Sequence, residues 1–171
     1  MFELKENITG QKAIYKTLLN IEKQDNVLVF EFYASHCSFY SASNKFNDPI
    51  YNGDVVEVFI KTKENNHYLE VELAPNGTLF IGDIFNDGKS RVLTMLENKG
   101  IIAETKKNNR DLMAKLIIPY KKYNIPEDIE FNAFRIDTDD GKVNAHLFAL
   151  NPTLCKTFHK PEAFVNLKNY K

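Results

Sequence analysis

The chain of 171 residues contains no tryptophan and carries almost no net charge. Its 22 Lys and Arg residues nearly balance its 23 Asp and Glu residues, and the basic residues are scattered along the chain. Because binding to nucleic acid requires a basic surface that neutralises phosphates, this balance argues against a nucleic-acid partner. Without tryptophan, any flat aromatic wall of a binding site has to come from the 8 Tyr, 13 Phe or 4 His side chains.

Long apolar runs are also absent. No segment approaches the roughly 20 apolar residues that cross a bilayer, and residues 1–10 have neither the basic nor the apolar part of an export signal. We therefore expect no membrane partner. The expected location is cytoplasmic for the chain as written, and extracellular if a leader was removed.

Cysteine is scarce, and its two copies lie far apart. Cys37 and Cys155 lack the CxxC spacing of zinc and redox sites. A domain of this length removes about 70% of its unfolded surface from water, so it does not need a cross-link to hold its core. Two reduced thiols are the first interpretation, and a disulfide between them is the alternative for a secreted chain.

Short strand-like runs make up most of the sequence. Helical periodicity is weak and confined to residues 11–19, whereas apolar and alternating runs recur with turn signals between them. Residues 87–109 fit a long connection with a short strand or helical turn. The runs are Asn26 to Ala34, Gly53 to Thr62, His67 to Ala74, Thr78 to Phe85, Leu112 to Ile118, Glu130 to Asp137 and Val143 to Leu150.

So many short strands with little helix predict an all-β fold. We expect an antiparallel β-sandwich, immunoglobulin-like or jelly-roll-like, with at most short helical turns. No segment rich in Pro, Gly or Ser divides the chain, so residues 1–171 are expected to form a single domain.

Three glutamates stand out in two of these strands. The alternation in residues 53–62 places Glu57 between two apolar side chains of one face. The alternation in residues 67–74 points Glu70 and Glu72 outward, roughly 7 Å apart by the strand rise. The paired carboxylates of glycoside hydrolases need separations of about 5 to 10 Å across a sugar, so a small glycosidase is one hypothesis. A solvated outer face explains the same pattern.

The acidic turn from Asp137 to Gly141 does not have the spacing of a calcium loop. An EF-hand loop needs Gly at its sixth position and Glu at its twelfth, whereas Gly141 is fifth and Phe148 is twelfth. A hairpin turn built on Asp-Gly is therefore favoured. His159 is interpreted on chemistry alone as part of a structural loop that Pro161 stiffens.

Five motifs, taken in order, resemble those of the carbohydrate-binding module family 9-like domains, which occur on xylanases and as free-standing bacterial proteins. Each is a short pattern of aromatic, acidic and turn residues. Ala133 and Val165 stand where the family pattern has Phe and Gly. The motifs are Tyr51 to Ile60, Tyr68 to Gly77, Ile118-Pro119-Tyr120, Asn132 to Ile136, and His146 to Pro152 leading into Phe158-His159-Lys160-Pro161-Glu162-Ala163-Phe164.

The resemblance implies an antiparallel β-sandwich that binds sugar without catalysis, with calcium as a structural ion in some members. It also implies a slot between two aromatic walls, at positions where sugar-binding members usually carry Trp. Here Tyr51 would form one wall and the loop of Phe158 and His159 the other, with Glu57 accepting hydrogen bonds from sugar hydroxyls. The implied ligand-binding residues are Tyr51, Glu57, Asn132, Arg135, Phe158 and His159, of which Asn132 and Arg135 would be clamps or supports.

The expected partner is therefore a mono- or oligosaccharide, with β-1,4-linked glucose or xylose units first, and a carbohydrate-active enzyme as a companion. No catalytic residue is expected under this hypothesis. Two alternatives remain: a small glycoside hydrolase that uses paired glutamates, and a protein-interaction sandwich that has lost sugar binding.

Overall fold

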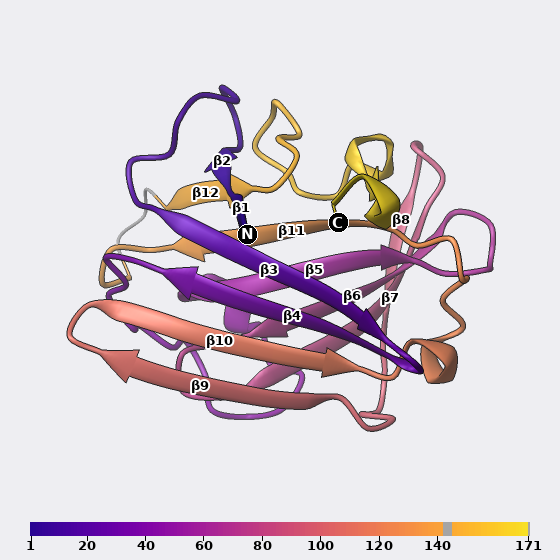
Figure 1. The fold of residues 1–171 in the computed structure, drawn as a ribbon, viewed down its shortest axis with the longest axis horizontal. Helices are drawn as coiled ribbons and strands as arrows, with labels where there is room; N and C mark the ends of the chain where they lie inside the picture. The colour runs from indigo at the N-terminus through magenta and orange to yellow at the C-terminus, as the bar shows by residue number, and fades with distance from the viewer. Residues whose placement is uncertain (142–144, 171) are drawn as a thin grey trace.

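The computed structural model describes residues 1–141 and 145–170, which form two antiparallel β-sheets stacked face to face (Figure 1). The helical segments are short 3-10 turns, η1 (Ile50–Asn52), η2 (Tyr120–Tyr123), η3 (Pro161–Ala163) and η4 (Leu167–Tyr170). Within the described residues, no helix is long and apolar enough to cross a membrane. The all-β sandwich that the sequence predicts is confirmed.

One sheet has five strands in the order β1-β3-β4-β10-β9. The central strand β4 packs its alternate residues Leu28, Phe30 and Phe32 into the core, where each is at most 1% exposed. The strands are β1 (Phe2–Glu3), β3 (Thr17–Gln24), β4 (Val27–Ala34), β9 (Ile102–Asn108) and β10 (Asp111–Ile118).

The other sheet has eight strands in the order β2-β12-β11-β5-β6-β7-β8, with β13 beside β11. Strands β5, β6 and β7 follow one another as a meander, and Gly77 supplies the positive φ of the turn between the last two. The strands are β2 (Lys5–Glu6), β5 (Val55–Lys61), β6 (His67–Leu73), β7 (Leu79–Asn86), β8 (Arg91–Met95), β11 (Glu130–Asp137), β12 (His146–Ala149) and β13 (Val165–Asn166).

The main core lies between the sheets and is filled by every second residue of the strands. In β5, Val56, Val58 and Ile60 join this core, whereas Glu57 and Phe59 lie on the opposite face. Because a slip of one residue would turn the apolar set to the other face, burial fixes the register of this strand. The alternation in the sequence thus predicts correctly which face each residue takes.

In two places the local structure differs from the weak patterns of the sequence. Residues 11–19 form no helix, because Ile14 is 67% exposed and β3 begins at Thr17. Residues 87–109 hold two strands, β8 and β9, which lie at the edges of the two sheets. Both strands are mostly exposed, so neither carries the apolar alternation of an inner strand. Val143, the expected start of the last predicted strand, lies outside the described residues.

The two cysteines are unpaired, as the first interpretation of the sequence expects. Cys37 is 3% exposed, and burial raises the pKa of its thiol to about 12. It therefore behaves as a small core side chain.

Candidate functional site

A cavity of about 300 Å³ opens on the outer face of the eight-stranded sheet. Its floor is made by the meander, because Glu57 of β5 pairs directly with Glu72 of β6, and Glu70 stands two positions away on the same face. The walls come from η1 with Tyr51 and from the loop before η3 with His159. Strands adjacent in sequence thus carry the floor, and distant loops enclose it.

Tyr51 and Phe158, the two expected walls, differ in how much surface they offer. The Tyr51 ring is 46% exposed and meets Phe80 edge-on, with ring centroids 6.4 Å apart. Phe158 is 7% exposed and stacks on Phe134 at 4.2 Å with an interplanar angle of 16°. Tyr51 therefore has a free aromatic surface for a ligand, and Phe158 mainly holds its loop against the sheet.

His159 is fixed by two aromatic neighbours. Its ring stacks on Phe59 with centroids 5.1 Å apart, and its Nδ1 lies 2.8 Å from the Tyr68 hydroxyl. Burial, with a smaller effect of the nearby Arg91 charge, lowers the pKa of His159 to about 4. The imidazole is therefore neutral at neutral pH. When Tyr68 donates to Nδ1, the ring proton sits on Nε2 and is a donor for a ligand.

The three glutamates of the floor form a tight cluster. Glu57, Glu70 and Glu72 are 2%, 6% and 1% exposed, and one carboxylate oxygen from each lies within 4.8 Å of the others. Glu57 Oε1 and Glu72 Oε2 have no hydrogen-bond partner, although both atoms are buried. The sequence correctly places Glu70 and Glu72 on the outer face, but a solvated surface is wrong for them because the surrounding loops and strands cover that face.

Burial dominates the electrostatics of this cluster. It raises the pKa of Glu70 to about 7, even though a hydrogen bond with Glu72 and the Arg91 charge act in the opposite direction. It also holds the pKa values of Glu57 and Glu72 well above their usual range, with repulsion from neighbouring carboxylates adding to the effect. Carboxylates this crowded favour a bound proton or another positive partner.

Asn132 does not line the cavity, although it was expected there. Its side-chain amide donates to the carbonyl oxygens of Asn151 at 2.8 Å and Ala163 at 3.3 Å. It thus anchors the segment that leads into the Phe158 loop, which is the support role rather than the clamp role.

Arg135 faces the opposite side of the sheet from the cavity. Its guanidinium pairs with Asp137, donates to Thr17 Oγ1 at 3.0 Å, and lies over the Phe148 ring. It is 1% exposed and joins the two sheets from within. The expectation that Arg135 contacts a ligand in the cavity is therefore wrong.

Several lining residues carried no signal in the sequence. Arg91 and Leu93 come from β8, which the sequence analysis took as part of a connection, and Lys156 and Thr157 lie between the two parts of the last motif. The structure brings four of the six expected site residues together in the cavity: Tyr51, Glu57, Phe158 and His159. Their role toward a ligand stays a prediction.

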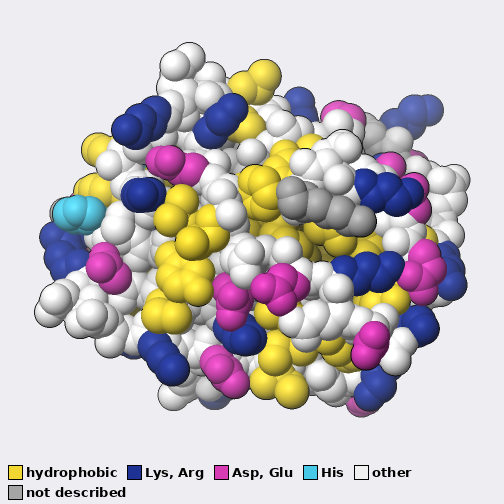
Figure 2. All heavy atoms as spheres, in the orientation of Figure 1, with side chains coloured by type: hydrophobic (Ala, Val, Ile, Leu, Met, Phe, Trp, Pro, Cys, Tyr) yellow, Lys and Arg dark blue, Asp and Glu magenta, His cyan; other side chains and the backbone are white. Residues whose placement is uncertain are grey.

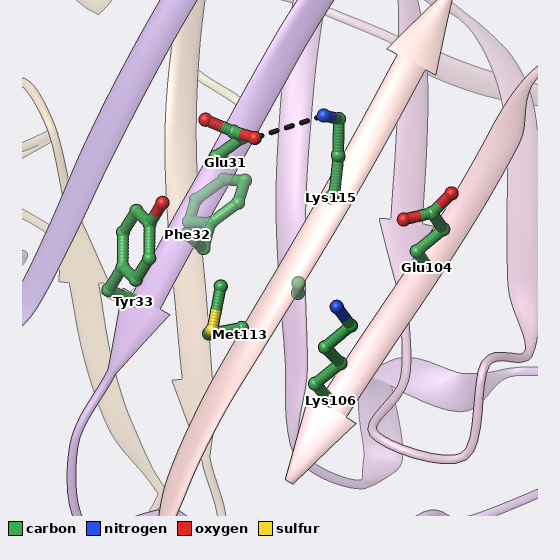
Figure 3. Close-up of a pocket in the computed structure, with 8 residues that line it drawn as sticks. Glu31, Phe32, Tyr33, Glu104, Lys106, Met113 and Lys115 are labelled. Atoms are coloured by element: carbon green, nitrogen blue, oxygen red, sulfur yellow. Dashed lines mark ion pairs between the residues drawn. The ribbon is translucent and has the colours of Figure 1, made fainter.

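A second cavity, of about 140 Å³, lies on the outer face of the five-stranded sheet (Figure 3). Two of its four charged side chains form an ion pair, since Glu31 Oε1 lies 3.0 Å from Lys115 Nζ. Tyr33 and Met113 add apolar surface beside this pair. Figure 2 shows the same face, where hydrophobic side chains alternate with charged ones. None of the residues that line this cavity has a buried polar side-chain atom without a partner, in contrast to Glu57 and Glu72 of the first cavity.

Comparison with known proteins decides the fold family. No protein-family model matches the chain. A protein of Arthroderma benhamiae described as "Extracellular protein" is 28% identical over 90 residues, which are 50% of this chain and 40% of that relative. The chain thus spans less than half the length of this curated relative.

Two solved structures align over almost the whole chain. A Bacteroides uniformis protein whose suggested role is carbohydrate binding has a TM-score of 0.77 at 14% identity, covering 96% of this chain and 84% of that one. A family 9 carbohydrate-binding module of Caldicellulosiruptor kristjanssonii, in complex with glucose, has a TM-score of 0.67 at 13% identity, covering 96% and 82%. The fold is that of a family 9-like carbohydrate-binding module.

The family 9-like fold agrees with the order of motifs in the sequence, so that resemblance is confirmed at the level of the fold. The motif strands Tyr51 to Ile60 and Tyr68 to Gly77 supply η1, β5 and β6, which form one wall and most of the floor of the cavity. Identities of 13% and 14% carry the fold and leave the ligand to be argued from the side chains.

Proposed function

We propose that the cavity on the eight-stranded sheet binds the end of a mono- or oligosaccharide without catalysis. The observation that carries this proposal is the exposed ring of Tyr51 beside buried carboxylate oxygens that lack partners. A sugar presents both matching surfaces, since its C–H face stacks on an aromatic ring and its hydroxyls donate to carboxylates. The glucose complex of the family 9 structural neighbour supports the same ligand class.

Some polar groups of the cavity would accept hydrogen bonds from sugar hydroxyls, and others would donate to them. Glu57 and Glu72 accept hydrogen bonds, and a ligand hydroxyl would satisfy an oxygen that otherwise stays buried and unpaired. Arg91, Lys156 and His159 also line the cavity and supply donors. We propose β-1,4-linked glucose or xylose as the first ligands to test. We also propose that the chain is bacterial and works together with a carbohydrate-active enzyme such as a xylanase.

Titration calorimetry with glucose, xylose and their β-1,4 oligomers tests the proposal. We expect binding with Kd below about 10 mM, which corresponds to roughly -3 kcal/mol, and we expect Tyr51→Ala to weaken it by about tenfold because the stacking surface is lost. The matched control is Tyr33→Ala, which removes a tyrosine from the second cavity on the other sheet. Loss of binding only in the Tyr33 variant, or no binding by the wild type, would overturn the proposal.

A glycosidase is the second candidate, and the carboxyl group of Glu70 is the observation that favours it. Its pKa of about 7 suits a general acid near neutral pH. The arrangement argues the other way, because three carboxylates crowded into one buried cluster, with one oxygen of each within 4.8 Å of the others, do not stand on two sides of a glycosidic bond. We expect no release of nitrophenol from aryl glycosides. Release that Glu70→Gln abolishes would replace the binding proposal with hydrolysis.

A further inference from the structure

Strand β8 leaves one edge of the eight-stranded sheet open. It is the last strand in the order of that sheet, so within the described residues it pairs with β7 on one side and with no strand on the other (Figure 1). All five of its residues are exposed, and its register with β7 runs without a bulge. An unpaired strand edge presents a row of free N–H and C=O groups, to which another strand can bind.

The hydrogen bonds to β7 identify which backbone groups of β8 are free. The Leu96 N–H donates to the Ile81 carbonyl oxygen at 2.9 Å, so these two residues form a hydrogen-bonded pair of the antiparallel ladder. Because such pairs alternate along a ladder, Val92 and Thr94 also bond toward β7. The backbone groups that point to the open side are those of Arg91, Leu93 and Met95.

The side chains of β8 lack the features that usually protect an edge. Residues 92–96 include no charged residue and no proline, and Val92 and Met95 are 54% and 59% exposed. The other sheet ends are protected, since β1 and β2 have two residues each and β9 carries Glu104, Lys106 and Lys107. Short or charged edge strands prevent pairing with another chain. The edge at β8 is therefore suited to accept a strand.

The segment from Arg91 to Glu97 is complementary to itself. When two copies of it run antiparallel with Thr94 opposite Thr94, Leu93 of each copy lies opposite Met95 of the other. In the same register Arg91 lies opposite Glu97, and neither side chain has an ion-pair partner among the described residues. Opposite charges at opposite positions stabilise a strand pair. This register also brings the free backbone groups of both copies face to face.

We propose that the protein forms a symmetric dimer in which the β8 strands of two copies pair antiparallel. A twofold axis perpendicular to the sheet passes beside Thr94 and joins the two eight-stranded sheets into one. Because this axis keeps the same face of both sheets on one side, the two cavities open in the same direction. The pairing itself does not rest on sugar binding. With the proposed function added, the dimer holds two chain ends of a polysaccharide at once.

The pairing also changes the rim of the cavity. Arg91 and Leu93 line the cavity, and they lie on the same face of β8 as Met95. In the dimer, Glu97 and Met95 of the second copy lie beside these two residues. Each cavity is therefore bordered by side chains of both copies.

Sedimentation velocity of the full chain, without any ligand, tests the dimer. We expect monomer at about 1 µM and mostly dimer at about 300 µM, because an interface built on one strand pair is small. The expected Kd is about 30 µM.

Thr94 variants locate the interface. Thr94→Lys and Thr94→Asp should each weaken the dimer by at least about tenfold, because like charges then lie directly opposite each other. A 1:1 mixture of the two variants should dimerise again, since opposite charges meet. Thr94 is exposed and lies on the face of β8 opposite to Leu93, so both variants should fold and keep the cavity. Recovery in the mixture separates loss of pairing from failure to fold.

Ile102→Lys is the matched control, because Ile102 is 54% exposed on β9 at the edge of the other sheet. It should leave the dimer intact. A wild type that stays monomeric at the highest concentration would overturn the proposal and leave β8 to a strand of a different protein. A dimer that Thr94→Lys retains, or that Ile102→Lys abolishes, would also overturn it. Thr94→Lys should bind a monosaccharide as the wild type does, so failure of the dimer is distinguishable from failure of sugar binding.

Discussion

At the scale of single residues, the site depends on polar groups that burial pushes away from their solution behaviour. His159 is the clearest case, because its chemistry alone suggested a structural loop, whereas the family resemblance implied a ligand-binding residue. The structure gives it stacking on Phe59, a bond with the Tyr68 hydroxyl and a place in the cavity. Its motif could be found in the sequence, but its neutral state could not, since the residues that bury it, such as Tyr68 at 91 positions away, are distant in the chain.

His159 predicts a dependence of stability on pH. Its folded pKa of about 4 lies below the ordinary value of 6.5, so between these values the unfolded chain binds the proton and the folded protein does not. Stability is therefore lost as pH falls from about 6.5 to about 4, by at most about 3 kcal/mol. The glutamate cluster has the opposite effect on stability. Because the pKa values of its carboxyl groups are raised in the folded protein, the free energy of unfolding falls as pH rises.

The difference between the wild type and His159→Gln isolates this histidine. We expect the gap in unfolding free energy, measured in urea, to shrink from about pH 7 to about pH 4.5 because the variant has no imidazole to protonate. A gap that is constant over this range would show that His159 is protonated equally in both states.

At the scale of elements, strand β11 shows how alternate residues of one strand take different structural roles on its two faces. Phe131, Ala133 and Arg135 point between the sheets, whereas Asn132 and Phe134 serve the outer layer. Period two in the sequence was enough to predict the strand. It was not enough to predict which polar residue meets a ligand, because both faces of this sheet are covered.

The edge strands explain the part of the fold that sequence analysis missed. All five residues of β8 are exposed, and β9 alternates only between exposed and partly buried positions. Apolar periodicity arises from burial, so strands that bury little leave no such pattern. Arg91 and Leu93 were missed as lining residues for this reason.

We expect the loss of the Arg135 side chain in β11 to destabilise the protein strongly. Arg135→Ala removes the partner of buried Asp137 and opens space beside Phe148, so we expect about 3 to 5 kcal/mol of destabilisation in denaturant unfolding. Lys115→Ala, which breaks the more exposed pair with Glu31, should cost about 1 kcal/mol or less. Equal effects of the two substitutions would mean that Arg135 does not join the sheets as described.

At the scale of the whole molecule, the N-terminal residues tie the two sheets together. β1 pairs with β3 in one sheet and β2 pairs with β12 in the other, while Leu4 between them is fully buried. The motif order predicted the sandwich, but such pairing between chain ends has no local signal. It follows from which edges remain open once the inner strands are paired.

The separation in sequence between floor and wall has a kinetic consequence. Neighbouring hairpins close short loops, whereas the contact of Tyr68 with His159 closes a loop of 91 positions, which costs more chain entropy. We expect the meander β5-β6-β7 to be formed in the folding transition state and the Phe158 loop to join later.

Val71→Ala in β6 should therefore slow refolding, and Phe158→Leu should mainly speed unfolding, as measured in stopped-flow chevron plots. Slower refolding of the Phe158 variant would contradict this order. A ligand that contacts both the floor and the late-joining loop would then lower the unfolding rate and leave the folding rate unchanged.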